Sequence, residues 1–374
     1  MATELPLRRS VKPYLAQLGA SPGRCPLIFY QAVLSKPFLL LPVPATLAFV
    51  TWNVSPVIVE LGPLLLRWYG VLFALGFVIG SFVLTHIYKK EDVRPYWVDV
   101  LTFYAVVGTV LGARLAHVFF YDWPSYRAHP WEILKVWHGG LASHGATIAI
   151  PLAVVVFSIR NKFDYLWVLD RIVIVVAIGG TCIRIGNLMN SEVGGKPTDV
   201  PWAFVFPRDT GHLQVPVSPL PAGAVLVKRS RLPSGEEHTK VLPASTTVRP
   251  GMEMAVPRHP TQLYESLFCV FLLMLLYGLW NNYRERTPRG LLLGLFLVLL
   301  FTFRILVEYL KENQVDAEDG IIAHYHLNIG QLLSIPFILI GLFVLVRAGK
   351  DSNNRYGYAP RGLPEGDAQM EAAN

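Results

Sequence analysis

The chain has 374 residues, of which 53% are hydrophobic and only 16% are charged, and its formal net charge at pH 7 is +7. Soluble domains usually carry about 25% charged residues, so this composition argues against a soluble domain and favours an integral membrane protein. The basic residues lie mostly between apolar segments, where membrane orientation explains the positive charge better than nucleic-acid binding does.

No sequence pattern indicates a metal or an organic cofactor. Cys25, Cys182 and Cys269 lack the close spacing of metal ligands, and two of them lie in or beside apolar runs, as buried small side chains do. The chain contains no glycine-rich phosphate loop and no HExxH or GxSxG motif. We therefore expect neither a metal nor a cofactor.

Residues 1–52 are predicted to form an N-terminal extension. Their apolar stretch LIFYQAVLSKPFLLLPVPATLAFV is interrupted by Lys36 and by three prolines, so an interfacial segment is favoured over an additional membrane span. No small-residue cleavage site follows a clean apolar core, which argues against a signal peptide.

Seven later segments are long and apolar enough to cross a bilayer core of about 30 Å, which takes roughly 20 helical residues. They lie at 64–88, 97–120, 142–159, 165–189, 262–281, 289–310 and 328–347. The third is the shortest and contains Pro151. The fold class predicted for residues 53–348 is an all-α integral membrane protein with seven transmembrane helices and a small extracytoplasmic head region.

Lysine and arginine in the short loops indicate the orientation, because cytoplasmic loops carry an excess of both. The loops after the odd-numbered spans hold Lys89, Lys90, Arg94, Arg160, Lys162, Arg284, Arg286, Arg289, Arg347 and Lys350. This pattern predicts that the N-terminus and the 190–261 loop face outward and that the polar tail 349–374 is cytoplasmic. Within that loop, residues 207–257 are rich in proline, serine, threonine and charge, and we expect them to form an extracytoplasmic insertion.

With this topology, the polar residues near the spans gather on the outer side of the membrane. They are Tyr69, Arg114, His144, Arg184, Glu265, Arg304 and Glu308. Charges that face the interior of a helix bundle are candidates for function by default.

Simpler interpretations stay open for several of these residues taken singly. Arg114, Tyr69 and Glu265 could reach the headgroups from a helix end. Arg304 could form a structural ion pair with Glu308, which lies one turn away. Two further polar residues of the second span are interpreted as structural: Asp99 and His117.

The chemistry of the set points to a phosphate. Guanidinium groups such as those of Arg184 and Arg304 match phosphate oxygens, and the abundant phosphates at a membrane face are lipid headgroups. The segment HGGLASHG contains Gly139, Gly140 and Gly145, where the backbone can approach a ligand closely. His144, in the same segment, has an ordinary pKa of about 6.5 and suits general-base catalysis.

The stretch IRIGNLMNSEVGG resembles the best motif of the phosphatidylglycerol:prolipoprotein diacylglyceryl transferase family. The matching positions are Arg184, Gly186, Asn187, Asn190, Glu192 and a final glycine that is Gly194 or Gly195. Leu188 and Ile183 replace the usual phenylalanine and glycine. Five other blocks match in order, namely LGPLLLRWYGVLFALGF, HGGLASHGA, RHPTQLYE, FRILVEYLKE and IGQLLSIP, and Asp170 stands at the position of a family aspartate.

The resemblance covers about residues 53–348, with departures at Lys311, where many members have arginine, and in the longer 207–257 insertion. It implies a multi-pass protein of the bacterial inner membrane that transfers a diacylglyceryl group from phosphatidylglycerol to the lipobox cysteine of a prolipoprotein signal peptide, releasing glycerol phosphate. Nucleic acid is not an expected partner.

The resemblance also implies roles for individual residues. Arg184 and Arg304 would clamp the lipid phosphate, and His144 would deprotonate the substrate thiol. Tyr69 would hydrogen-bond the lipid. The remaining expected contacts to phosphatidylglycerol come from Asn187, Asn190, Glu192, Gly139, Gly140, Gly145 and Glu308.

Two other classes of protein were considered. A transporter or flippase also places polar residues in its spans, but it commonly has internal repeats and charges at the membrane midplane, and neither pattern is found in this sequence. A retinal-binding seven-helix protein needs a Schiff-base lysine, and the last span, NIGQLLSIPFILIGLFVLV, contains none.

Overall fold

The computed structural model describes residues 49–61, 64–135, 140, 142–217, 220–231, 237–243, 246–312 and 327–350. The chain divides into two compact units, residues 1–47 and 48–374, and every described residue belongs to the second. The interfacial segment expected in the N-terminal extension and most of the expected cytoplasmic tail lie outside the described residues.

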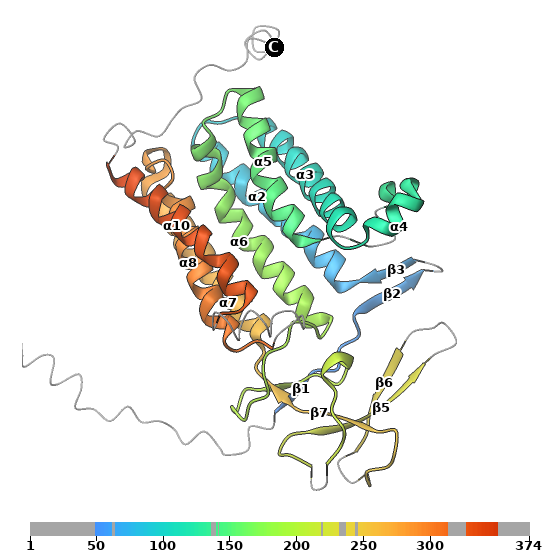
Figure 1. The fold of residues 1–374 in the computed structure, drawn as a ribbon. Coiled ribbons are helices and arrows are strands. Elements are labelled where there is room, and N and C mark those ends of the chain that lie inside the picture. The colour runs from blue at the N-terminus through green and yellow to red at the C-terminus, as the bar shows by residue number, and fades with distance from the viewer. Residues whose placement is uncertain are drawn as a thin grey trace, which may run out of the picture. The chain divides into compact units, whose positions relative to one another are not determined.

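Long helices form the body of the second unit, and they lie side by side in Figure 1. They are α2 (Trp68–Lys90), α3 (Tyr96–Phe120), α5 (Ser143–Asn161), α6 (Tyr165–Met189), α7 (Thr261–Tyr283), α8 (Leu291–Glu308) and α10 (Ile329–Lys350). Shorter helical pieces are α4 (Trp123–Ala128), η1 (Pro130–Leu134), η3 (Thr210–His212) and η4 (Arg284–Arg286).

Among the described residues, six of these helices are long and apolar enough to cross a membrane: α2, α3, α6, α7, α8 and α10. The third expected span corresponds to α5, whose apolar part, Gly145–Asn161, falls in a shorter class. A multi-pass membrane protein is therefore confirmed, and a seventh crossing stays a prediction. The expected start of the first span at residue 64 is wrong, because Leu64–Arg67 pairs as a strand and the helix begins at Trp68.

Helix α6 is the central element, with 61% of its most apolar window buried against 22–33% for the other spans. Arg171 on α6 is fully buried and forms an ion pair with Glu91, at the end of α2, at 2.9 Å. Trp280 of α7 donates to the same carboxylate. The neighbouring Asp170 accepts hydrogen bonds from the backbone of Gly290 and Leu293, so it caps the N-terminus of α8.

Helices α3 and α5 pack at close range through small residues. A Cβ at Gly112 would overlap Ala149, and a Cβ at Gly145 would overlap the backbone of Gly112 and the side chain of Ala116. Small residues four positions apart allow two membrane helices to approach this closely. This packing fixes the start of α5, where His144 lies.

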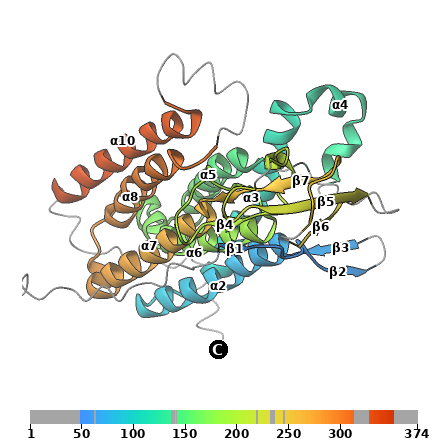
Figure 2. The same ribbon diagram turned by 90° about the horizontal axis from the view of Figure 1, so that it is seen from below.

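Strands occupy one end of the bundle, which the sequence did not predict. The sheets are β1-β4-β8 (Val50–Thr51, Phe204–Val205, Pro257–Arg258), the hairpin β2-β3 (Val57–Leu61, Leu64–Arg67), and β6-β5-β7 (Glu237–Val241, Val225–Arg231, Glu253–Ala255). The expected 207–257 insertion contains the last of these sheets, which packs around buried Leu226, Met254 and Val256. Figure 2, seen from below, shows strands of these sheets. The expected all-α class therefore holds for the spans but not for this head.

Candidate active site

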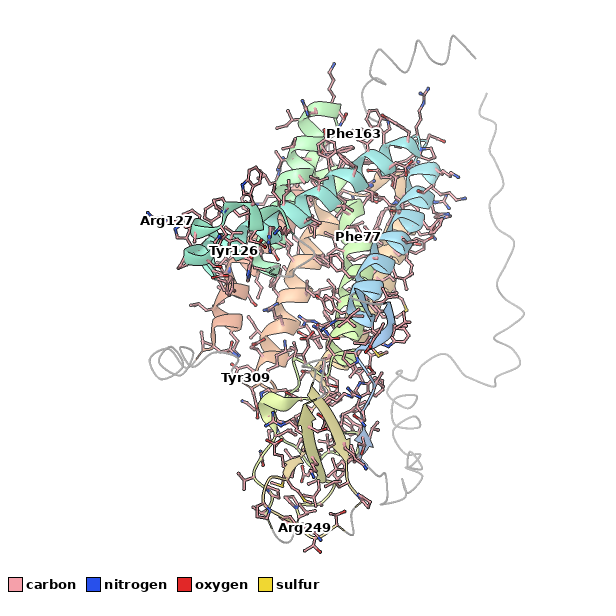
Figure 3. The ribbon with its side chains drawn as sticks, turned by 90° about the vertical axis from the view of Figure 1, so that its right-hand side faces the viewer. Phe77, Tyr126, Arg127, Phe163, Arg249 and Tyr309 are labelled. Carbon is pink, nitrogen blue, oxygen red and sulfur yellow. The ribbon has the colours of Figure 1, made fainter. Side chains whose placement is uncertain are left out.

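The polar residues of the α6 motif lie where α6 meets the head. Figure 3 shows Tyr309, just after α8, at the head end of the bundle and Phe163 at the opposite end. After α6 the chain turns sharply, and Ser191 and Val193 both adopt left-handed backbone conformations, with φ of 55° and 61°. Such a conformation is a genuine outlier for a β-branched residue, and it persists only where surrounding contacts impose it.

The N-terminus of α7 supplies those contacts. The Thr261 hydroxyl donates to the carbonyl of Val193 at 2.8 Å, and the Gln262 amide donates to the carbonyl of Glu192 at 2.6 Å. The block RHPTQLYE therefore holds the turn that follows α6, which ends within the stretch IRIGNLMNSEVGG. Both side chains are fully buried.

Gly195 is the glycine of the motif that the fold requires. A Cβ there would lie 2.7 Å from the Cβ of His259 and 2.8 Å from the carbonyl of Leu310, whereas at Gly194 it would make only ordinary contacts. The Gly195 amide also donates to the carbonyl of His259 at 2.9 Å. Packing therefore requires a glycine at Gly195, and which of the two matches the final glycine of the family motif stays open.

Arg184 is held by two partners from different parts of the chain. Its Nε lies 3.0 Å from Oε2 of Glu265 on α7, and its Nη1 donates to Asn187 at 3.2 Å. Asn187 and Asn190 both donate to Oε1 of Glu192 at 3.0 Å. The predicted residues of the α6 motif therefore form one connected network.

The network continues to the end of α8 through Lys311, which neither hydropathy nor charge near the spans singles out. Lys311 is buried and lies 2.9 Å from Glu265 and 3.6 Å from Glu308. Glu308 in turn packs against α10, because a Cβ at Gly330 would lie 2.7 Å from its carboxylate. Buried Glu265 is thus ion-paired, so its interpretation as a residue reaching for the headgroups is wrong.

Arg304 lies one turn before Glu308 on α8, but the two do not form the ion pair considered from the sequence. Within the part of the chain that the structure describes, Arg304 makes no ion pair, and its buried Nε has no hydrogen-bond partner. Three other buried atoms at this end also lack a hydrogen bond among the described residues, namely Asn190 Oδ1, Ser191 Oγ and Gln262 Oε1. Buried polar atoms are normally hydrogen-bonded, so the Nε of Arg304 and these three atoms mark a candidate ligand site.

Tyr69 joins the cluster from α2. Its ring packs against Gly186 of α6, where a Cβ would lie 2.9 Å from the ring. Three spans that are distant in sequence therefore meet at Arg184.

The histidine-containing segment is described in part. Gly139 and the side chain of His144 lie outside the described residues, while the backbone of His144 belongs to the first turn of α5. Gly140 lies against His117 and Arg114, and Gly145 lies against α3. These two glycines therefore have a packing role, and their part in lipid binding stays a prediction.

Arg114 does not reach for the headgroups, so that interpretation is wrong. It is only 3% exposed, and its guanidinium donates to several backbone carbonyls, including that of Ile133 at 2.9 Å.

Outside the spans, burial lowers the pKa of His259 below its ordinary value, which favours the neutral imidazole at pH 7. Among the described residues no cluster of histidine, cysteine or carboxylate side chains is arranged to hold a metal ion.

Six apolar helices, among the described residues, are long enough to cross a membrane, and arginines and buried polar atoms lie together at one end of them. These features define a multi-pass membrane protein with a polar site at its helix ends. A family model described as prolipoprotein diacylglyceryl transferase matches residues 56–347. The chain belongs to this family.

Individual relatives agree with the assignment. The chain is 38% identical over 311 residues to the phosphatidylglycerol–prolipoprotein diacylglyceryl transferase of Chloroherpeton thalassium, covering 82% of this chain and 97% of the relative. It is 38% identical over 306 residues to the protein of the same name from Tolumonas auensis, covering 80% and 98%. The protein of the same name from Porphyromonas gingivalis is 39% identical over 309 residues, which cover 81% of this chain and 96% of the relative.

Proposed function

We propose that this protein transfers the diacylglyceryl group of phosphatidylglycerol to the lipobox cysteine of a prolipoprotein signal peptide, forming a thioether and releasing glycerol phosphate. The observation that carries the proposal is that Arg184 on α6 and Arg304 on α8 lie at the same end of the bundle, where Glu265 holds Arg184 and the buried Nε of Arg304 has no hydrogen-bond partner among the described residues. The names of the relatives supply the two substrates.

Arg184 is pre-oriented to bind a phosphate. Glu265 and Asn187 occupy its Nε and Nη1, and its Nη2 donates no hydrogen bond among the described residues. A guanidinium that is fixed on one side and open on the other can donate to a phosphate oxygen without reorganising during the reaction. Asn190 and Glu192 stabilise this arrangement through Asn187.

Arg304 supplies the second donor. Its buried Nε has no acceptor among the described residues, and an anionic oxygen would satisfy it. With two guanidinium groups on the phosphate, the charge that develops on the leaving group is stabilised. Glu308 and Lys311 fix the end of α8 from which Arg304 is presented.

The substrate thiol is the nucleophile. A free thiol has a pKa of about 8.5, so removal of its proton by His144 would raise the thiolate fraction at neutral pH. The thiolate then attacks the carbon of the diacylglyceryl group that is bonded to a phosphate oxygen. The new C–S bond replaces the C–O bond, whose electron pair leaves with glycerol phosphate, while His144 retains the thiol proton. Tyr69 hydrogen-bonds the lipid in this scheme.

We place the site on the outer face of the bacterial inner membrane, with the N-terminus outside and the C-terminal tail in the cytoplasm. The basic loops after α2 and α7 support this orientation, because they lie at the end of the bundle opposite the site. Both substrates, a membrane phospholipid and a membrane-inserted signal peptide, would be accessible there.

The test combines the purified protein with phosphatidylglycerol vesicles and a lipobox peptide, and the peptide mass is followed. The expected product is a peptide heavier by one diacylglyceryl group, with no product from the same peptide carrying serine in place of cysteine. Unmodified cysteine peptide after incubation with folded protein would contradict the proposal. Modification of the serine peptide would contradict the role given to the thiol.

A further inference from the structure

Arg114, near the end of α3, connects two segments of the chain. Its Nε donates to the carbonyl of Ile133 at 2.9 Å, and its Nη2 donates to those of Glu132 and, at 3.3 Å, Lys135. Its Nη1 donates to the carbonyl of Gly140 at 3.1 Å. One guanidinium therefore ties the region around η1 to the residues that lead into α5.

The same turn of α3 fixes the backbone on both sides of His144. The amide of Ala142 donates to the carbonyl of Ala113 at 2.9 Å, and Gly145 lies directly against Gly112. Gly140 has a φ of 74°, and a Cβ there would lie 2.7 Å from the ring of His117 and 2.8 Å from Nη1 of Arg114.

Arg114 also contacts the short helix α4. Its guanidinium carbon lies 5.0 Å from the centre of the Tyr126 ring. The neighbouring Arg127 points away from the bundle, as Figure 3 shows. The two arginines therefore form a matched pair, in which one is buried among carbonyls and the other lies on the outside.

We propose that Arg114 is a positioning residue, which sets the backbone that carries His144 by tying Glu132–Lys135 to Gly140. The planar guanidinium has five donors in a fixed fork and can satisfy several carbonyls at once, which the single ammonium of lysine cannot. Displacing a reacting group by 1 Å can cost a rate factor of about 100, so a loss of this fork should reduce turnover.

The proposal rests on the proposed function for its kinetic test, which compares Arg114→Lys with Arg127→Lys in the vesicle and peptide assay. For Arg114→Lys, kcat should fall at least about tenfold while the KM for phosphatidylglycerol stays within about threefold, because positioning and lipid binding are separate. Arg127→Lys should match the wild type. Arg114→Lys with more than about half of the wild-type kcat would show that charge alone suffices and would overturn the proposal.

Amide hydrogen exchange provides a readout that does not depend on turnover. In Arg114→Lys, amides of Trp131–Lys135 and of residues 142–146 should exchange faster, while those of α6 and α7 keep wild-type rates. Unchanged exchange in both segments would overturn the proposal even if the protein lacked transferase activity. A wild type that fails to modify the peptide while Arg114→Lys shows the faster exchange would contradict the proposed function only.

If Arg114→Lys does not fold, Gly140→Ala tests the same contact from the other side. Gly251 is the matched control, because it has a similar φ of 83° but nothing within 4 Å of an added Cβ. Gly140→Ala should lower kcat and Gly251→Ala should not. A Gly140→Ala variant with wild-type kcat, or with only a raised KM, would overturn the proposal.

Discussion

At the scale of single residues, the site depends on how Arg184 is held. The sequence motif grouped Arg184 with Asn187 and Glu192 correctly because all three lie within about two turns of one helix end, where spacing determines proximity. Glu265 was known from its sequence block, but its ion pair with Arg184 could not be predicted, since it depends on how α6 and α7 pack.

Replacing Arg184 tests the phosphate role. Arg184→Ala removes a donor to the leaving group and is expected to lower kcat about 100-fold or more, as loss of a transition-state donor typically does. Lys228→Ala is the control, because Lys228 is exposed on β5 of the head. Initial rates with the lipobox peptide provide the measurement. A wild-type rate for Arg184→Ala would show that this guanidinium does not act on the phosphate.

His144 is tested by its pH dependence. A general base with an ordinary pKa of about 6.5 loses activity as the pH falls and it becomes protonated. In His144→Gln this acid limb of the kcat/KM profile should disappear along with most of the rate. An unchanged profile and rate would remove the assignment of His144 as the base.

At the scale of elements, helix type and approximate limits followed from hydropathy, but the helix ends did not. Hydropathy assigns strand β3 to the first span, because its leucines are as apolar as the helix that follows. Lys311 lies beyond the end of α8, where helical periodicity no longer predicts which way a side chain points, so its contacts with Glu265 and Glu308 could not be predicted.

Gly330 of α10 shows how one element positions another. Its hydrogen is all that fits beside the Glu308 carboxylate, so Gly330→Ala should push Glu308 away and disturb Arg304 on the same helix. We expect kcat/KM to fall about tenfold, within the range of a displaced catalytic group.

The control lies on the same helix. Gly349 has open space around an added Cβ, so Gly349→Ala should keep wild-type kinetics and strengthen the helix slightly. Equal kinetics for the two variants would mean that the packing of Glu308 on Gly330 has no part in the site.

At the scale of the whole molecule, the arrangement separates two kinds of buried charge. At one end, Arg171 and Glu91 satisfy each other in a closed pair beside Trp280. At the other, Arg184 and Arg304 keep unused donors. The sequence predicts that polar residues lie together at one membrane face. It does not distinguish the structural ion pair from the candidate site, because both consist of charged residues in or next to the spans. Only the contacts in the folded chain separate them.

The orientation can be measured with single cysteines. Lys240→Cys in the head should react with a membrane-impermeant maleimide in intact cells, and Lys350→Cys at the end of α10 should react only after the membrane is opened. The reverse pattern would place the site on the cytoplasmic face and exclude the proposed topology.

The most direct test of the central claim is to find which bond of phosphatidylglycerol breaks. With lipid carrying radioactive phosphorus, attack on the glyceryl carbon sends all of the label into water-soluble glycerol phosphate and leaves the peptide unlabelled. The phosphate clamp of Arg184 and Arg304 requires this result, because it makes the phosphate the leaving group. Label retained on the modified peptide would mean attack at phosphorus and would contradict the account.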